Sequence, residues 1–126
     1  MNGRFYKTLV ALMWLALPIT ALHYWQNWDQ LPVRMAVHFD ANYQPNGYTS
    51  REGALELGLG IMAVMLVLFT VGALTARALK PSASWPLLLG FGVVLGLIAY
   101  GNFSIIRFNL NLAAPHPPPV NMSVPQ

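Results

Sequence analysis

Three long apolar runs dominate the chain, and the polar residues collect between and beyond them. The runs cover about residues 8–28, 55–76 and 85–106. A helix needs roughly 20 predominantly apolar residues to cross the hydrocarbon core of a bilayer. The pattern therefore predicts an all-α integral membrane protein with three transmembrane helices, in which residues 1–113 form one membrane domain.

The first run has the flanks of a membrane span. Arg4 and Lys7 precede it, and Pro18 is expected to loosen the helix because proline lacks an N–H and crowds the preceding turn. Aromatic residues, which favour the headgroup region, gather at its far end: Tyr24, Trp25 and Trp28. A cleavable signal peptide is the alternative, since that signal also combines a basic start with an apolar stretch.

The longest polar interval, residues 29–54, separates the first two runs. Apolar and polar residues alternate over residues 33–39, which is typical of an extended segment with one apolar face. The residues 45–47, with the sequence PNG, favour a turn. Thr49 and Glu52 fit a capping box at the start of the second helix. We therefore predict an ordered loop with an extended arm, a turn and a capped helix start.

The third run is expected to begin with Pro86 in its first helical turn, where proline is tolerated. Gly92 and Gly96 form a small-xxx-small pair, a spacing that allows two helix backbones to approach closely. Packing within one subunit is expected, and contact between copies in a homo-oligomer is the alternative. Residues 114–126 are rich in proline and are predicted to form a disordered tail.

Composition supports a membrane protein and excludes several other classes. Hydrophobic residues make up 56% of the chain and charged residues only 9%, whereas soluble domains carry about 25% charged residues. The net charge of +3 is scattered, without a basic stripe interleaved with aromatic residues, so nucleic-acid binding is not expected. Cysteine is absent, which excludes disulfides, thiolate catalysis and cysteine-based metal sites.

The basic residues divide into two groups if the chain crosses the membrane three times. One group would lie on the side of the N-terminus: Arg4, Lys7, Arg77 and Lys80. The other would lie on the side of the central loop: Arg34, Arg51 and Arg107. Lys and Arg near the spans favour the cytoplasm. We therefore expect a multi-pass protein of the cell membrane with a cytoplasmic N-terminus and an extracytoplasmic central loop and tail.

Several residues of the polar interval together resemble a known signature. They are Leu31-Pro32, His38-Phe39-Asp40-Ala41, Pro45-Asn46-Gly47-Tyr48 and Ser50-Arg51. Their order and spacing are similar to domain-of-unknown-function family 1648. This small membrane domain is also found at the start of SdpI-type immunity and signalling proteins of bacteria. The resemblance covers about half the chain, from the end of the first span through the second.

Four positions depart from the pattern of that family. Tyr43 and Thr49 stand where glycine is common, and Gln44 and Asn46 replace residues that are commonly acidic. If the acidic loop residues of relatives contact a cationic partner, this chain has lost part of that contact.

The resemblance implies a non-enzymatic protein whose loop recognises a peptide or a membrane partner, as in SdpI-like immunity or sensing. The candidate recognition residues are those that carry the resemblance: Leu31, Pro32, His38, Phe39, Asp40, Pro45, Asn46, Gly47, Tyr48, Ser50 and Arg51. The alternative is an accessory subunit of a transporter or other membrane complex that packs through Gly92 and Gly96. In either case the lipid bilayer is an expected partner.

Few residues could support other chemistry. His38 and Asp40 would share one face of an extended segment, with His23, Glu52 and Glu56 at the helix ends. Their spacing matches no established zinc motif, so neither a metal nor another cofactor is expected. A His38 that hydrogen-bonds the loop backbone is the preferred interpretation. No nucleophile–base pair, phosphate loop or HExxH pattern is recognisable, so an enzyme is not expected.

Glu56 is the ionisable residue nearest to the middle of a span. A carboxylate at the bilayer centre costs roughly 2.5–3.5 kcal/mol, and less near the headgroups. We expect Glu56 to reach the headgroups or to pair with Arg34 or Arg51 at the membrane surface.

Overall fold

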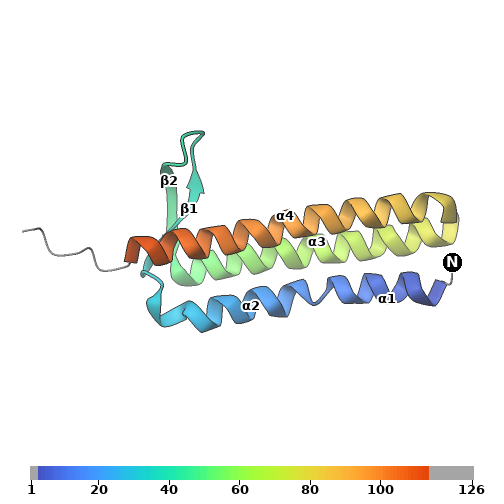
Figure 1. Ribbon diagram of the computed structural model, residues 1–126, viewed down its shortest axis with the longest axis horizontal. Helices are drawn as coiled ribbons and strands as arrows, with labels where there is room; N and C mark the ends of the chain where they lie inside the picture. The colour runs from blue at the N-terminus through green and yellow to red at the C-terminus, as the bar shows by residue number, and fades with distance from the viewer. Residues whose placement is uncertain (1–2, 114–126) are drawn as a thin grey trace, which may run out of the picture.

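The computed structural model describes residues 3–113, so the proline-rich tail lies outside the described residues. The elements follow in the order α1 (Gly3–Met13), α2 (Ala16–Asn27), the 3₁₀ helix η1 (Trp28–Gln30), β1 (Arg34–Phe39), β2 (Pro45–Ser50), α3 (Arg51–Leu79) and α4 (Pro81–Ala113). In Figure 1, α1 and α2 run in line beside the antiparallel pair of α3 and α4. The N-terminus and the α3–α4 connection lie at one end, and the β-hairpin projects from the other.

Three helical segments are long and apolar enough to cross a membrane: Gly3–Gln30, Arg51–Leu79 and Pro81–Ala113. This agrees with the predicted number of spans. However, α3 has 29 residues and α4 has 33, more than predicted. At about 1.5 Å per residue, both exceed the roughly 30 Å thickness of the hydrocarbon core. Their ends therefore reach beyond the apolar layer.

Large apolar side chains cover the outside of the spans. Those on α3 that are more than half exposed are Leu57, Val64, Val67, Leu68, Val71 and Leu79. Soluble proteins rarely expose continuous apolar surfaces of this kind. A lipid bilayer would bury these side chains.

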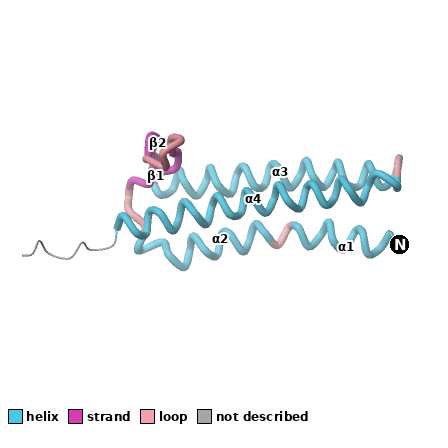
Figure 2. Tube along the Cα trace, turned by 45° about the horizontal axis from the view of Figure 1, so that its top comes forward, coloured by secondary structure: helices cyan, strands magenta, loops and turns pink. Residues whose placement is uncertain are grey.

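The first span is interrupted near its middle, as Pro18 predicted. Trp14 and Leu15 separate α1 from α2, and Trp14 lies four residues before the proline. The ring of a proline crowds the carbonyl group four residues back and provides no N–H for it. The N–H of Leu17 instead bonds to the Trp14 carbonyl at 3.3 Å, over a shorter turn. The pink break between α1 and α2 is visible in Figure 2.

Two predicted helix starts are corrected. Ser50, not Thr49, caps α3, because its hydroxyl accepts a hydrogen bond from the Gly53 N–H at 2.9 Å. The helix α4 begins at Pro81, five residues before Pro86, which lies inside it. The earlier proline fits the first helical position because its missing N–H would have no partner there.

The buried apolar residues form three clusters along the length of the bundle. One lies near the N-terminus: Tyr6, Val10, Ala73 and Leu88. The second lies in the middle: Met62, Leu66, Phe69 and Leu95. The third lies at the hairpin end: Tyr24, Leu31, Met35, Ala54 and Ile106. The third cluster therefore joins the helices to the hairpin.

Side-chain hydrogen bonds also tie the first span to the other two. The Tyr6 hydroxyl donates to carbonyl oxygens of Ala73 at 2.9 Å and Ser84 at 3.2 Å. Nε1 of Trp14 donates to Oγ1 of Thr70 at 2.8 Å. Bonds between membrane helices contribute about 0.6 kcal/mol on average. They add to apolar packing in holding the first span against α3.

The polar interval contains a two-stranded antiparallel sheet, so the chain is mostly helical but not all-α. Met35 pairs with Thr49 and Ala36 with Tyr48, and the register shifts beyond Ala36. The predicted turn at residues 45–47 is wrong, since these residues begin β2. Residues 40–44 form the turn instead, because Asp40 accepts backbone hydrogen bonds there.

Gly92 and Gly96 do not pack against another part of the described chain. A Cβ atom added at either position would meet nothing within 4 Å. The expected packing within one subunit is therefore wrong. The two glycines lie on the exposed surface of α4.

Candidate functional site

The β-hairpin and the helix ends beneath it bring together most of the predicted recognition residues. Figure 1 shows β1 and β2 side by side at the end of α3 and α4 away from their connection, with the strands standing across the helices. Three residues separate η1 from β1, and β2 leads directly into α3. The position of the hairpin is therefore set by three helix ends: the end of η1, the start of α3 and the end of α4.

A single asparagine of α4 anchors the hairpin. Oδ1 of Asn109 accepts from the Ala36 N–H at 2.8 Å, and Nδ2 of Asn109 donates to the Ala36 carbonyl at 2.8 Å. Nδ2 also donates to the Ile105 carbonyl at 2.8 Å, which orients the amide. Both Asn109 and Ala36 are fully buried. The amide thus bonds to the outer edge of β1 as a neighbouring strand would.

An apolar face of β1 packs on the helices. Met35 is fully buried in the cluster at the hairpin end. The ring of Phe39 meets that of Phe108 edge to face, with 4.8 Å between centroids. Leu31, before β1, is buried in the same cluster as Met35. These contacts assign a packing role to Leu31 and Phe39 of the predicted recognition residues.

Arg51 connects η1 to the start of α3. Its Nη1 donates to the Trp28 carbonyl at 3.1 Å, and its guanidinium lies 4.8 Å from the centre of the Trp28 ring. Nε lies 3.7 Å from a carboxylate oxygen of Glu52. The backbone N–H of Arg51 donates to the Val33 carbonyl at 2.9 Å. Arg51 therefore holds the two sides of the polar interval together.

The outer face of the hairpin consists of polar and aromatic side chains. Nδ1 of His38 hydrogen-bonds Oδ1 of Asn46, rather than the expected backbone group. The guanidinium of Arg34 lies 5.0 Å from the centre of the Tyr48 ring. All four of these residues are exposed. A Cβ at Gly47 would lie 2.8 Å from that of His38, so only glycine allows this close strand pairing.

The tip of the hairpin shows why glycine is common at position 43 in the family pattern. Oδ1 of Asp40 accepts from the N–H groups of Asn42 at 2.8 Å and Gln44 at 3.0 Å. Tyr43 between them has φ 60°, the left-handed region. This conformation costs an L-residue roughly 1–2 kcal/mol relative to glycine. The Tyr43 side chain is 84% exposed, so packing does not offset that cost.

Glu56 does not make the predicted ion pair. Its side chain is exposed on α3, and it pairs with neither Arg34 nor Arg51. Residues 3–113 contain no group of three or more His, Asp or Glu side chains placed to hold a metal ion. The ring of His23, the other histidine near this end, packs edge to face against Phe103.

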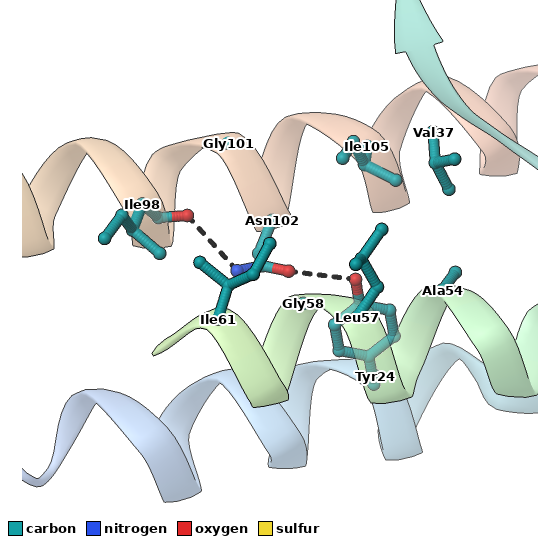
Figure 3. Close-up of a pocket in the computed structure, with 10 residues that line it drawn as sticks. All are labelled: Tyr24, Val37, Ala54, Leu57, Gly58, Ile61, Ile98, Gly101, Asn102 and Ile105. Carbon is teal, nitrogen blue, oxygen red and sulfur yellow. Dashed lines mark hydrogen bonds between the residues drawn. The ribbon is translucent and has the colours of Figure 1, made fainter. Parts of the chain in front are cut away.

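A second polar contact lies beneath the hairpin, inside the bundle. The Tyr24 hydroxyl donates to Oδ1 of Asn102 at 3.0 Å, and Nδ2 of Asn102 donates to the Ile98 carbonyl at 3.2 Å. In Figure 3, Tyr24 of α2 reaches past Gly58 of α3 to meet Asn102 of α4. A Cβ at Gly58 would clash with Oδ1 of Asn102 and lie 3.0 Å from the Tyr24 hydroxyl.

Sequence reasoning missed the residues that position this site: Tyr24 as a bonding group, Gly58, Asn102 and Asn109. One signal was present. Asn102 and Asn109 are seven residues apart in an apolar helix, so they lie on one face. Polar residues within membrane spans usually face the bundle interior.

The comparison with known families confirms the resemblance. Residues 9–67 match the family model described as a domain of unknown function (DUF1648). The matched segment runs from α1 through the hairpin into α3. Both Asn102 and Asn109 lie outside it. No curated protein and no solved structure matches the chain.

Proposed function

We propose that this protein is a non-enzymatic membrane protein whose β-hairpin recognises a peptide or a membrane partner outside the cytoplasm, as in SdpI-like immunity or sensing. One observation carries the proposal. The hairpin is fixed to the bundle through both backbone groups of the buried Ala36, while its outer face leaves His38, Asn46 and Tyr48 exposed. A held strand pair with an accessible polar face is preorganised for binding, which lowers the entropic cost of association.

The internal bonds of the hairpin argue against catalysis. His38 is occupied by Asn46, and the Asp40 carboxylate accepts two backbone N–H groups at the turn. His38 and Asp40 do not hydrogen-bond to each other, as the members of a catalytic pair would. Both residues therefore support the shape of the hairpin, which serves recognition.

The placement outside the cytoplasm is supported by the distribution of charge. Arg4, Lys7, Arg77 and Lys80 gather at the end opposite the hairpin, without any acidic residue. Basic residues near span ends favour the cytoplasmic side.

Cysteine labelling tests this placement, because the chain has no native cysteine. Ala41→Cys at the hairpin turn and Ser82→Cys at the start of α4 both occupy exposed positions. We expect a membrane-impermeant maleimide to label position 41, but not 82, in intact cells. Labelling at 82 alone would place the hairpin in the cytoplasm and contradict recognition of extracytoplasmic partners.

Photo-crosslinking tests recognition itself. A photoreactive phenylalanine derivative at Tyr48 should give a discrete adduct in native membranes, and the same group at Leu79, exposed at the opposite end, should not. Asn109→Leu, which leaves the outer face of the hairpin unchanged, should reduce the adduct because it releases β1. Identical adducts at both positions would contradict a recognition surface on the hairpin.

A second function is favoured by the surface of α4. Gly92 and Gly96 face open space, and glycines at this spacing allow close helix contact. We propose as the alternative that the chain is an accessory subunit packed through this surface. Gly92→Leu or Gly96→Leu would then disrupt the complex, whereas substitutions on the hairpin would not.

A further inference from the structure

A hollow between α2 and α4, near the hairpin end of the bundle, is not used by the proposed recognition function. It is lined by His23 of α2 and by Phe103, Arg107, Leu110 and Asn111 of α4. Phe103, Arg107 and Asn111 follow each other at intervals of four residues, so they lie along one face of α4. The hollow therefore brings a guanidinium, an imidazole and an amide together from two helices.

Arg107 is the basic residue of the hairpin end whose side chain is available to a ligand. The guanidinium of Arg34 lies over the Tyr48 ring, and that of Arg51 bonds to the Trp28 carbonyl. Within the part of the chain that the structure describes, Arg107 makes no hydrogen bond, ion pair or ring contact. Its side chain is exposed and forms part of the wall of the hollow.

The charges around the hollow favour an anionic ligand. No Asp or Glu is among the described residues that line it, so the charge of Arg107 is not compensated there. A guanidinium can donate two parallel hydrogen bonds to a phosphate or a carboxylate. A ring nitrogen of His23 and the amide of Asn111 can donate as well. The negative end of the α4 dipole acts only within the last turn, and Arg107 precedes that turn.

The level of the hollow in the bilayer indicates which anion it meets. Arg107 directly follows the third apolar run, residues 85–106. His23 lies two residues before Trp25, which is 75% exposed, and exposed tryptophans favour the headgroup region. Phe103 lies one turn closer to the middle of α4 and gives the hollow an apolar side. At this level the phosphate groups of phospholipids are the anions that surround the bundle.

We propose that the hollow between α2 and α4 binds the phosphate of an anionic phospholipid. Arg107 holds two phosphate oxygens, His23 and Asn111 donate to the same headgroup, and the start of an acyl chain lies against Phe103. A lipid with a net negative charge is favoured over a zwitterionic one, because the hollow offers a cation but no carboxylate for a headgroup amine. The proposal does not depend on what the hairpin recognises.

Native mass spectrometry of the full-length protein tests this site with phosphatidylglycerol and phosphatidylcholine as probes. Arg107→Gln should lower the affinity for phosphatidylglycerol by about tenfold or more, because it removes charge-assisted hydrogen bonds. The matched control is Arg34→Gln, which makes the same change in charge at the same end but does not line the hollow. It should lower the affinity by less than about twofold.

Two outcomes of that comparison would overturn the proposal. Equal losses in Arg107→Gln and Arg34→Gln would mean a diffuse attraction of anionic lipid to basic residues, without a site. Equal binding of phosphatidylglycerol and phosphatidylcholine by the native protein would remove the selectivity for an anionic headgroup.

His23→Phe provides a second variant if Arg107→Gln fails to fold. It keeps an aromatic ring beside Phe103 but removes both ring nitrogens, so it should lower the affinity for phosphatidylglycerol by about two- to fivefold. An unchanged affinity would overturn the site.

Inorganic phosphate separates a lipid headgroup from a free ion as the source of the phosphate. At millimolar concentration it should not displace phosphatidylglycerol from the native protein, because it makes no apolar contact with Phe103. Displacement by inorganic phosphate would assign the site to a free phosphate ion and overturn the binding of a lipid.

Discussion

The two ends of this three-span bundle are held together by different kinds of hydrogen bond. At the N-terminal end, the Tyr6 hydroxyl donates to the carbonyl groups of Ala73 and Ser84. Both carbonyls lie within helices, where they already accept a backbone N–H. At the hairpin end, the Asn109 amide bonds to the N–H and the carbonyl of Ala36, which belong to a strand edge. The Tyr6 contact adds a hydrogen bond to carbonyl groups that already have a partner. The Asn109 contact provides the partner for two backbone groups of the strand.

Charge separates the two ends in the same way. The N-terminal end carries four basic residues and no acidic residue, whereas all four acidic residues lie toward the hairpin: Asp29, Asp40, Glu52 and Glu56. Asp40 and Glu52 have partners within the hairpin and the α3 start. The hairpin end thus combines specific polar contacts with an accessible surface. The opposite end carries the basic residues that commonly set membrane orientation.

Asn109→Leu should have the largest effect, because it leaves two buried backbone groups of Ala36 without partners. Each unsatisfied group costs about 1–3 kcal/mol, so we expect a loss of roughly 2–6 kcal/mol in the free energy of unfolding. Denaturation in mixed micelles measures this loss, and faster amide hydrogen exchange in β1 would localise it. Asn111→Leu, at an exposed position of the same helix, should change stability by less than about 0.5 kcal/mol. Equal effects would mean that Asn109 does not hold the hairpin.

Gly58→Ala should follow, and it tests whether the Tyr24–Asn102 contact supports the hairpin end. The added Cβ would clash with Asn102, and overpacking typically costs about 1–3 kcal/mol. The control is Gly60→Ala on the same helix, where a Cβ meets nothing within 4 Å. It should stabilise the helix by about 0.5–1 kcal/mol, because alanine loses less backbone entropy. Thermal unfolding of both variants should therefore show shifts of opposite sign.

The sequence predicted the parts of this fold that depend on local pattern. Three apolar runs indicated three spans, and Pro18 indicated the break at Trp14, because both follow from the chemistry of neighbouring residues. The prediction of a turn at residues 45–47 was wrong, although it also relied on neighbouring residues. The Asp40 carboxylate stabilises an earlier turn, even though that turn forces Tyr43 to a positive φ.

The candidate site was less predictable, because its partners are distant in the sequence. Asn109 lies 73 residues from Ala36, and Asn102 lies 78 residues from Tyr24. No local pattern reports such pairs. The predicted pairing of Glu56 with Arg51 failed because Arg51 is occupied by Trp28 and Glu52. Local rules could identify the hairpin residues but not which of them pack and which remain exposed.

Tyr6→Phe sharpens the contrast between the ends, because it removes the contact at the N-terminal end without leaving a backbone group unpaired. The expected loss is about 0.5–1.5 kcal/mol, that of one typical hydrogen bond, and so smaller than for Asn109→Leu. Tyr100→Phe provides the control, since Tyr100 is 70% exposed. Unfolding in mixed micelles again gives the comparison. A loss equal to that of Asn109→Leu would remove the distinction between the two ends.

Tyr43→Gly should have the smallest effect and the opposite sign. Glycine relieves the roughly 1–2 kcal/mol cost of a left-handed backbone, but it loses about 0.5–1 kcal/mol more conformational entropy on folding. The side chain is 84% exposed and contributes little packing, so we expect a net gain of up to about 1 kcal/mol. Tyr43→Ala retains the strained backbone and should give no gain, which separates strain from the loss of the ring. Slower hydrogen exchange at the Gln44 amide in the glycine variant would place the gain at the hairpin turn. If both variants lose stability equally, the ring itself stabilises the turn, and the glycine of the family pattern needs another explanation.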